Sequence, residues 1–135
     1  MVSFHASLLL DITGTTYDQT ILFSHVDTNL GGGYNATTGV FTAPVAGQYQ
    51  FSLTFMLYQM SSSYSYFGEL DVLKNGNMII RVHANINQQA SHVDSASGAT
   101  VMGLNKGDKV SVVAAVEGMY IRGISYTYFS GFFLG

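Results

Sequence analysis

The sequence predicts an all-β protein built as a sandwich of short strands, and three observations carry that prediction. A set of mostly aromatic residues, here called anchors, recurs at irregular intervals that end in strict alternation. One face of a helix would instead need apolar residues at i, i+3, i+4 and i+7. These anchors are Phe23, Asn29, Tyr34, Phe41, Gly47, Tyr49 and Phe51. Turn-forming residues punctuate the chain at short intervals, as expected for consecutive short strands. No segment has a convincing helical period, so a sandwich is favoured.

Alternation and intervening turn residues place the strands in the first half of the chain. Turns are expected at residues 11–14, 31–33 and 35–39, where Gly, Asp, Asn and Thr gather. The expected strands are residues 2–10, 21–26, 40–44 and 48–59.

The second half contains two hairpin signals. Asn75-Gly76 is typical of a type I′ turn, because both central residues need a positive φ. A second tight turn is expected at residues 105–108, Asn-Lys-Gly-Asp. The expected strands are residues 66–74, 78–87, 99–104, 109–116, 119–122 and 126–134.

Length and composition indicate a single domain that meets partner subunits. Residues 1–135 form one domain in the simplest interpretation, because single domains most often contain about 100 to 150 residues. Charged residues make up only 10% of the chain, against roughly 25% in an average soluble domain. We therefore expect part of the surface to be buried against partners.

Charge and residue usage exclude several functions. A net charge of −3 with five Lys and Arg leaves no basic patch to release counterions from phosphates, so we predict no nucleic-acid binding. The absence of cysteine excludes disulfides, thiolate metal sites and a cysteine nucleophile. No apolar run reaches the roughly 18 residues of a membrane helix, so we predict no membrane insertion. The N-terminus lacks signal-peptide features, so the chain is either intracellular or a mature domain cut from a precursor.

Two predicted strands are apolar on both faces. They are residues 110–116, VSVVAAV, and 129–134, FSGFFL. A sandwich strand with one wet face should alternate, so each strand is either a central strand beneath a loop or part of a subunit contact. We favour subunit packing, because exposed apolar faces often mark interfaces.

The anchors resemble the signature of the C1q domain over its whole length, with one departure. Two places after Phe51 that family has an aromatic residue, and here the position is Leu53, an apolar substitution that core packing tolerates. Three further segments are similar to the family in the same order: residues 39–49, GVFTAPVAGQY; residues 73–76, LKNG; and residues 128–134, YFSGFFL.

This resemblance implies a ten-stranded jelly roll of the C1q and tumour necrosis factor type, assembled as a compact homotrimer. It also implies a secreted, extracellular recognition protein without known catalysis, like the invertebrate C1q-domain lectins. The sequence agrees that the protein is not an enzyme, because it has no HExxH and no Gly-x-Ser-x-Gly motif. Glu69 and Asp71 share a strand face but are expected to form only a solvated edge, and His83 is expected to be structural.

Some family members bind calcium in the loop that corresponds here to residues 87–94. The resemblance aligns Asp94 with an acid or amide of the family, and Asn87 and Gln88 with acids of some members. Calcium needs several oxygen ligands, and one carboxylate per subunit would make a weak site. The alternative, a solvated polar loop without metal, is therefore favoured, and no cofactor is required.

The same loop is the leading candidate for sugar recognition, because amides and carboxylates on surface loops bind hydroxyl groups. Its polar residues are Asn87, Gln88, Gln89, His92 and Asp94. Tyr64, Tyr66 and Tyr120 are candidate aromatic platforms, though each could instead lie in the core or an interface. Arg122 could pair with an acidic sugar or form a salt bridge. Asn35-Ala36-Thr37 is a glycosylation sequon, which matters only in a secreted protein.

We therefore expect a non-catalytic pattern-recognition lectin of innate immunity that binds glycans or other microbial surface ligands through apical loops of a homotrimer. The alternative is an adiponectin-like or collagen-like head that binds a protein receptor or nucleates a trimer. An upstream collagen segment would favour the alternative, although no Gly-X-Y repeat occurs in these residues.

Overall fold

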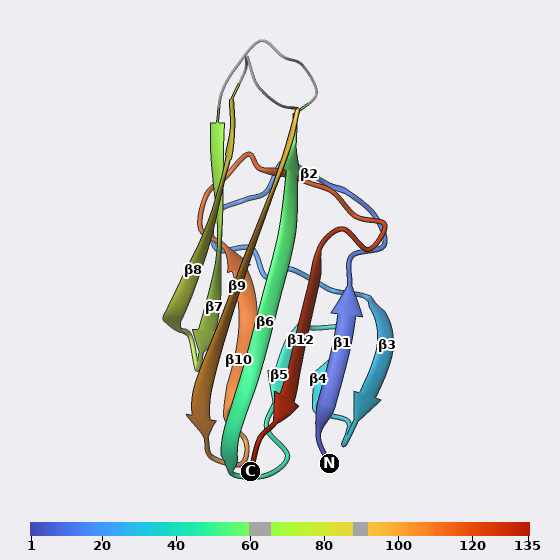
Figure 1. The fold of residues 1–135 in the computed structure, drawn as a ribbon, viewed down its shortest axis with the longest axis vertical. Coiled ribbons are helices and arrows are strands. Elements are labelled where there is room, and N and C mark those ends of the chain that lie inside the picture. The colour runs from blue at the N-terminus through green and yellow to red at the C-terminus, as the bar shows by residue number, and fades with distance from the viewer. Residues whose placement is uncertain (60–65, 88–91) are drawn as a thin grey trace.

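A computed structural model describes residues 1–59, 66–87 and 92–135, and within them the chain forms strands and no helix (Figure 1). The strands are β1 Ser3–Ser7, β2 Ile12–Thr13, β3 His25–Leu30, β4 Tyr34–Asn35, β5 Val40–Thr42, β6 Gly47–Tyr58, β7 Tyr66–Lys74, β8 Asn77–Ile86, β9 Val93–Leu104, β10 Lys109–Ala114, β11 Tyr120–Ile121 and β12 Tyr128–Phe133. Twelve strands exceed the ten implied by the resemblance, and three of them, β2, β4 and β11, contain only two residues.

These strands form two antiparallel sheets that pack face to face, so the predicted all-β jelly-roll sandwich is confirmed. The seven-stranded sheet has the order β2-β11-β6-β12-β1-β3, with β9 pairing β6 on its other side. The five-stranded sheet has the order β4-β5-β10-β7-β8. Across the described residues there is no helix with the length and apolarity of a membrane span.

The predicted central hairpin is confirmed, whereas two predicted strands begin four or more residues away from their expected starts. Asn75 and Gly76 have φ values of 49° and 84°, as a type I′ turn requires. The predicted strand at 21–26 begins only at His25; residues before it lie beside β10, where Ile21 N donates to Val112 O at 2.8 Å. The strand predicted to begin at residue 99 begins at Val93. Its first half is rich in Ser and Gly and lacks an apolar pattern, but pairing with β6 holds it in the sheet.

The core is an aromatic cluster centred on Phe4, which joins the two sheets. The Phe4 ring stacks on Tyr34 and Phe41 of the five-stranded sheet, with centroid distances of 4.9 and 5.2 Å. On its own sheet it meets Phe129 edge-on at 5.2 Å and Phe51 at 6.3 Å. Such pairs are worth roughly 0.5 to 1.5 kcal/mol each beyond area burial, so this cluster fixes how the sheets stack.

Three of the sequence anchors, Phe23, Asn29 and Tyr34, form a hydrogen-bonded clasp at the edge of this cluster. The Asn29 amide donates to Tyr34 O at 2.8 Å and accepts from Tyr34 N at 3.1 Å. The Tyr34 hydroxyl donates to Phe23 O at 3.0 Å and accepts from Phe23 N at 3.2 Å. The clasp thus provides hydrogen-bond partners for the backbone groups of Phe23 and Tyr34. It links Tyr34 to residues 5 and 11 positions earlier in the chain.

The two strands that are apolar on both faces differ. β10 is central in its sheet, and Val113, on its outer face, is buried within the chain itself. The burial of β10 therefore needs no second subunit. For this strand the alternative interpretation, a central strand covered by its own chain, is the one that applies. β12, in contrast, leaves Phe132 exposed, with Leu134 exposed just beyond it.

Gly131 in β12 is required by the aromatic packing. A Cβ atom at this position would lie 2.6 Å from Phe51 Cδ1 and 2.8 Å from Phe4 Cε1. We predict that Gly131→Ala lowers the free energy of unfolding by about 1 to 3 kcal/mol, as overpacking does, measured by urea denaturation. Ser111→Ala, on the outer face of β10 in the other sheet, is the control and should change it by less than about 0.5 kcal/mol. Equal effects of the two substitutions would contradict this assignment.

The clasp also predicts a dependence of stability on alkaline pH. Burial raises the pKa of Tyr34 to about 12, although its hydrogen bond to the Phe23 backbone opposes the shift. Above pH 10 the unfolded state loses the Tyr34 proton while the folded state keeps it, so stability falls as pH rises from 10 towards 12. Urea titrations from pH 8 to 11.5 should show this slope in the wild type and a shallower one in Tyr34→Phe. Parallel slopes in the two proteins would refute the prediction.

Candidate functional site

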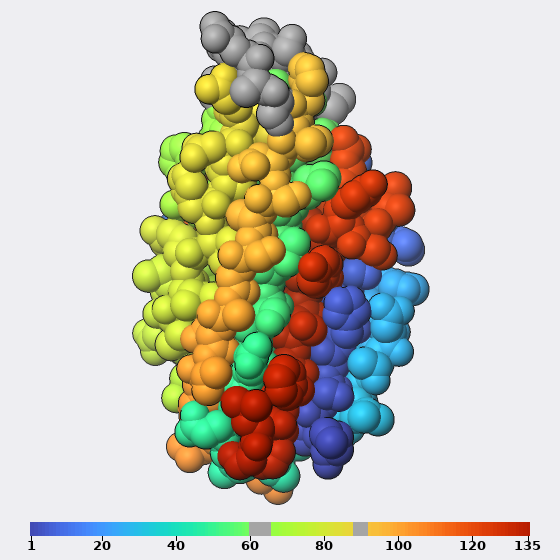
Figure 2. All heavy atoms as spheres, viewed as in Figure 1, coloured from blue at the N-terminus to red at the C-terminus, as the bar shows by residue number. Residues whose placement is uncertain are grey.

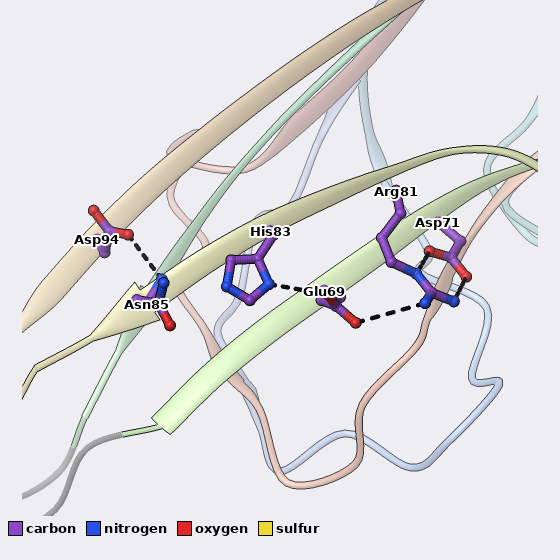
Figure 3. Close-up of polar contacts among 6 residues, drawn as sticks. All are labelled: Glu69, Asp71, Arg81, His83, Asn85 and Asp94. Atoms are coloured by element: carbon purple, nitrogen blue, oxygen red, sulfur yellow. Dashed lines mark hydrogen bonds and ion pairs between the residues drawn. The ribbon is translucent and has the colours of Figure 1, made fainter.

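The outer face of β7 and β8 contains four charged or ionisable residues that form cross-strand pairs (Figure 3). We call Glu69, Asp71, Arg81 and His83 the charged ladder. Asp71 lies opposite Arg81, and Glu69 lies opposite His83. This pairing depends on a β-bulge between Val72 and Leu73, which shifts the register by one residue. Counting from the Asn75-Gly76 turn without the bulge would pair each carboxylate with an apolar residue of β8.

Arg81 is committed to Asp71. Arg81 Nε contacts Asp71 Oδ1 at 2.7 Å, and Arg81 Nη2 contacts Asp71 Oδ2 at 2.9 Å, which makes a two-point ion pair. A weaker contact of 3.8 Å joins Arg81 Nη1 to Glu69 Oε1. The Asp71 hydrogen bond and charge raise the pKa of the Arg81 guanidinium above its usual value. Asp71 is only 6% exposed, so this pair fixes the ladder rather than offering a free charge.

The other half of the ladder is more open. His83 Nδ1 lies 2.9 Å from Glu69 Oε2, which orients the imidazole, and the His83 side chain is 44% exposed. The Phe67 ring stacks on that imidazole at a centroid distance of 5.4 Å and an interplanar angle of 22°, and Phe67 is 46% exposed. Together with Asn85, the next outward residue of β8, these side chains place an aromatic ring beside a carboxylate, an imidazole and an amide. Sequence reasoning missed this group, although it noted Glu69 and Asp71 as a pair on one strand face and His83 by itself.

Only the two ends of the predicted polar loop at residues 87–94 are described, namely Asn87 and residues 92–94. Gln88, Gln89 and Tyr64 fall outside the described residues. Asn87 is exposed after the end of β8, and His92 is exposed before β9. His92 is joined to the end of β6, since Gln59 N donates to His92 O at 3.1 Å and the side chains approach to 3.4 Å.

Asp94, the predicted calcium-binding carboxylate, lies within β9 rather than in a loop. Its Oδ2 atom accepts a hydrogen bond of 2.9 Å from Asn85 N, which joins the edges of the two sheets (Figure 3). Part of its charge is therefore used to satisfy a backbone group of β8. Across residues 1–59, 66–87 and 92–135, no group of three or more His, Asp or Glu side chains is arranged to bind a metal ion.

Three other predicted ligand residues, Tyr66, Tyr120 and Arg122, gather around Tyr58. The Arg122 guanidinium lies 3.9 Å from the Tyr58 ring centroid and pairs with Asp11 at 3.1 Å. Tyr120 meets Tyr58 edge-on at 5.7 Å, and the Tyr66 hydroxyl donates to Tyr58 O. Arg122 thus forms the salt bridge that was the alternative to acidic-sugar binding.

An exposed apolar patch lies where residues 8–10 and 123–126 meet. We call Leu9, Leu10, Leu22, Ile124 and Tyr126 the apolar patch. Leu10 is 77% exposed and Ile124 is 71% exposed, and Leu9 O accepts from Ile124 N at 3.1 Å. Ile124 has a φ of 50°, which is strained for a β-branched residue. A cavity of about 300 Å³ between residues 8–12 and 19–24 adjoins the patch.

The outer face of the seven-stranded sheet differs chemically from the charged ladder. On β6, β9 and β12 alternate side chains point outward, opposite to buried residues such as Phe51 and Phe129. We call these outward residues the uncharged face: Gln50, Ser52, Thr54, Met56, Ser95, Ser97, Ala99, Val101, Tyr128, Ser130 and Phe132. None carries a formal charge, and most are small. Figure 2 shows the three strands side by side on one face of the molecule.

Comparison with known proteins adds to this geometry. The family model described as the C1q domain matches residues 3–134. The chain is 29% identical over 133 residues to Caprin-2 of Danio rerio, covering 98% of the chain and 14% of that protein. It is 28% identical over 134 residues to complement C1q tumor necrosis factor-related protein 3 of Homo sapiens, covering 98% and 51%. The hibernation-associated plasma protein HP-25 of Tamias sibiricus is 29% identical over 117 residues, covering 86% and 50%.

The chain therefore spans about half or less of the length of these relatives. Among solved structures, the globular domain of zebrafish complement 1qA protein matches with a TM-score of 0.72 and 20% identity, covering 100% of this chain and 98% of that chain. Murine APRIL at pH 5.0 matches with a TM-score of 0.73 and 14% identity, covering 98% of each chain. At these identities, the structural matches establish the fold alone.

Proposed function

The chain belongs to the C1q-domain family, and on that premise we propose that it is a non-catalytic pattern-recognition lectin of innate immunity. It acts outside the cell as a homotrimer and binds glycans or other microbial surface ligands. One relative is named as a plasma protein, which supports an extracellular placement. The observation that carries the ligand class is the group formed by Phe67, His83, Glu69 and Asn85.

This group has the chemistry that saccharides require. The exposed Phe67 ring provides an apolar surface for sugar C–H groups, while Glu69 accepts and Asn85 both donates and accepts hydrogen bonds. All four residues lie on paired strands, and the His83 to Glu69 contact of 2.9 Å limits side-chain freedom. Asn87 and His92 are exposed and add further polar groups, and Gln88, Gln89 and Tyr64, also proposed as ligand residues, lie outside the described residues.

A homotrimer is supported by the uncharged face. Burying charged groups without partners is costly, whereas Ser52, Ala99 and Ser130 at the centre of the face have small neutral side chains that permit close approach. Exposed Phe132 adds apolar area at its margin. Three copies presented together would strengthen a ligand site that is weak in one subunit.

We propose that calcium is not required for this function. Asp94 already accepts a hydrogen bond from Asn85 N, so the carboxylate is less available to a cation. Asn87 and Gln88 would add only neutral oxygens, and calcium prefers several carboxylate and carbonyl ligands.

The second candidate function is a signalling or trimerisation head that binds a protein receptor. The apolar patch favours it, because Leu10 and Ile124 are largely exposed. Exposed apolar patches often mark sites of contact with another protein. This candidate is also in keeping with the similarity to complement C1q tumor necrosis factor-related protein 3.

Substitution of Phe67 separates the two candidates. A glycan array on the purified protein should identify ligands, and Phe67→Ala should weaken their binding at least tenfold, about 1.4 kcal/mol, in calorimetric titration. Tyr126→Ala, which removes an exposed aromatic residue of the apolar patch, is the matched control and should leave glycan binding unchanged. Binding should be equal with calcium and with a chelator. No glycan bound in either condition, or equal losses in both variants, would reject the lectin proposal.

The homotrimer is tested by placing a charge on the uncharged face. Light scattering after size exclusion should give three times the chain mass of 14.6 kDa for the wild type. Ser52→Arg should yield monomer, because its guanidinium would be buried without a partner. Ser111→Arg, on the outer face of the five-stranded sheet, should remain trimeric. A monomeric wild type, or a trimeric Ser52→Arg, would refute the assignment.

A further inference from the structure

The sequon Asn35-Ala36-Thr37 is the one Asn-X-Ser/Thr motif in the chain, and none of the functions above uses it. It begins at the last residue of β4 and continues into the turn to β5. Gly39 N donates to Asn35 O at 2.8 Å, and Gly39 has a φ of 73°, which closes this turn tightly.

The side chain of Asn35 is held in a defined orientation within the turn. Thr37 N donates to Asn35 Oδ1 at 2.9 Å, an Asx turn. Because Oδ1 faces the backbone, Nδ2 on the other branch of the carboxamide is directed away from it. Within the described residues, Asn35 Nδ2 donates no hydrogen bond, and both Asn35 and Thr37 are exposed.

The surroundings of Asn35 leave room for a bulky group. One hollow of about 400 Å³ lies between Asn35 and the segments 31–33, 42–44 and 106–107. A second of about 260 Å³ lies beside Thr38, Val40 and Lys109. Both border Asn35, so the first sugars of an attached chain could lie against the surface without displacing core residues.

The position of Asn35 separates it from the other surfaces. β4 is the terminal strand of the five-stranded sheet, whereas β8 of the charged ladder is at the opposite edge. Figure 1 also shows β4 and β5 in the same half of the sandwich as the two chain termini. The uncharged face belongs to the other sheet. A glycan here would cover an exposed sheet edge, which is otherwise open to pairing with other chains, and would leave the other surfaces free.

We propose that Asn35 is an N-glycosylation site of the secreted protein. In the transfer, Asn35 Nδ2 forms a bond to C1 of the first sugar of a lipid-linked oligosaccharyl pyrophosphate. The bond between C1 and the pyrophosphate oxygen breaks, the pyrophosphate leaves with the electron pair, and the amide nitrogen gives up one proton. The inference rests on the extracellular placement proposed above and is independent of what the protein binds.

The test is secretion of residues 1–135 from eukaryotic cells behind a heterologous signal peptide, followed by intact-mass measurement. The wild type should carry an added mass that peptide N-glycosidase removes, with conversion of Asn35 to Asp mapped by peptide sequencing. Asn35→Gln and Thr37→Ala should both lose the added mass. Thr37→Ser should keep it, and so should Thr38→Ala, which removes the neighbouring hydroxyl outside the sequon.

Two outcomes overturn the proposal: a secreted wild type of unmodified mass, or an added mass that persists in Asn35→Gln. If the Asn35 variant is not secreted, the contrast between Thr37→Ala and Thr37→Ser decides the question. Enzymatic removal of the glycan should not change the oligomeric state, and a change in assembly would refute the separation of Asn35 from the interface. The mass measurement does not depend on ligand binding, so failure of the lectin proposal would leave it intact.

Discussion

The structure depends on the contact of aromatic rings around Phe4, which joins two sheets whose described strands pair only within their own sheet. Phe4 stacks on Tyr34 across the sandwich and meets Phe129 on its own sheet. This packing is possible because Gly131 has no side chain to separate Phe51 from Phe4. The clasp of Asn29, Tyr34 and Phe23 then satisfies the backbone where irregular segments enter the core, since buried polar groups must be paired.

Because the inward residues form the core, the candidate functional surfaces lie on the outer faces of the two sheets. One of these surfaces is uncharged and the other carries charged side chains. The seven-stranded sheet presents the uncharged face, on which the proposed homotrimer rests. The five-stranded sheet presents the charged ladder, in which Arg81 neutralises buried Asp71 and leaves Glu69 and His83 more open. Phe67, stacked on His83, adds an apolar surface to that polar group. The division follows from strand alternation, because every second residue of a sheet faces away from the core.

The sequence predicted the site only in part. Of the predicted polar loop, Asn87 and His92 are described and exposed, whereas its role in binding stays a prediction. Arg122 and Asp94, however, are occupied by Asp11 and by Asn85 N. The charged ladder was missed because a bulge near Leu73 shifts the pairing of β7 with β8. A bulge of this kind leaves no mark in the hydrophobic pattern, so the partners of Glu69 and Asp71 could not be assigned.

By itself the sequence determined the all-β class, the type I′ hairpin at Asn75-Gly76, the aromatic anchors and the family. These properties depend on local backbone preference and on the order of apolar residues along the chain. Only the tertiary structure decided which outward residues meet, as for Asp11 and Arg122, separated by 111 positions. It also decided that β10 is covered by its own chain whereas β12 is not. Such contacts depend on strand order, register and sheet stacking, which arise only when the whole core has packed.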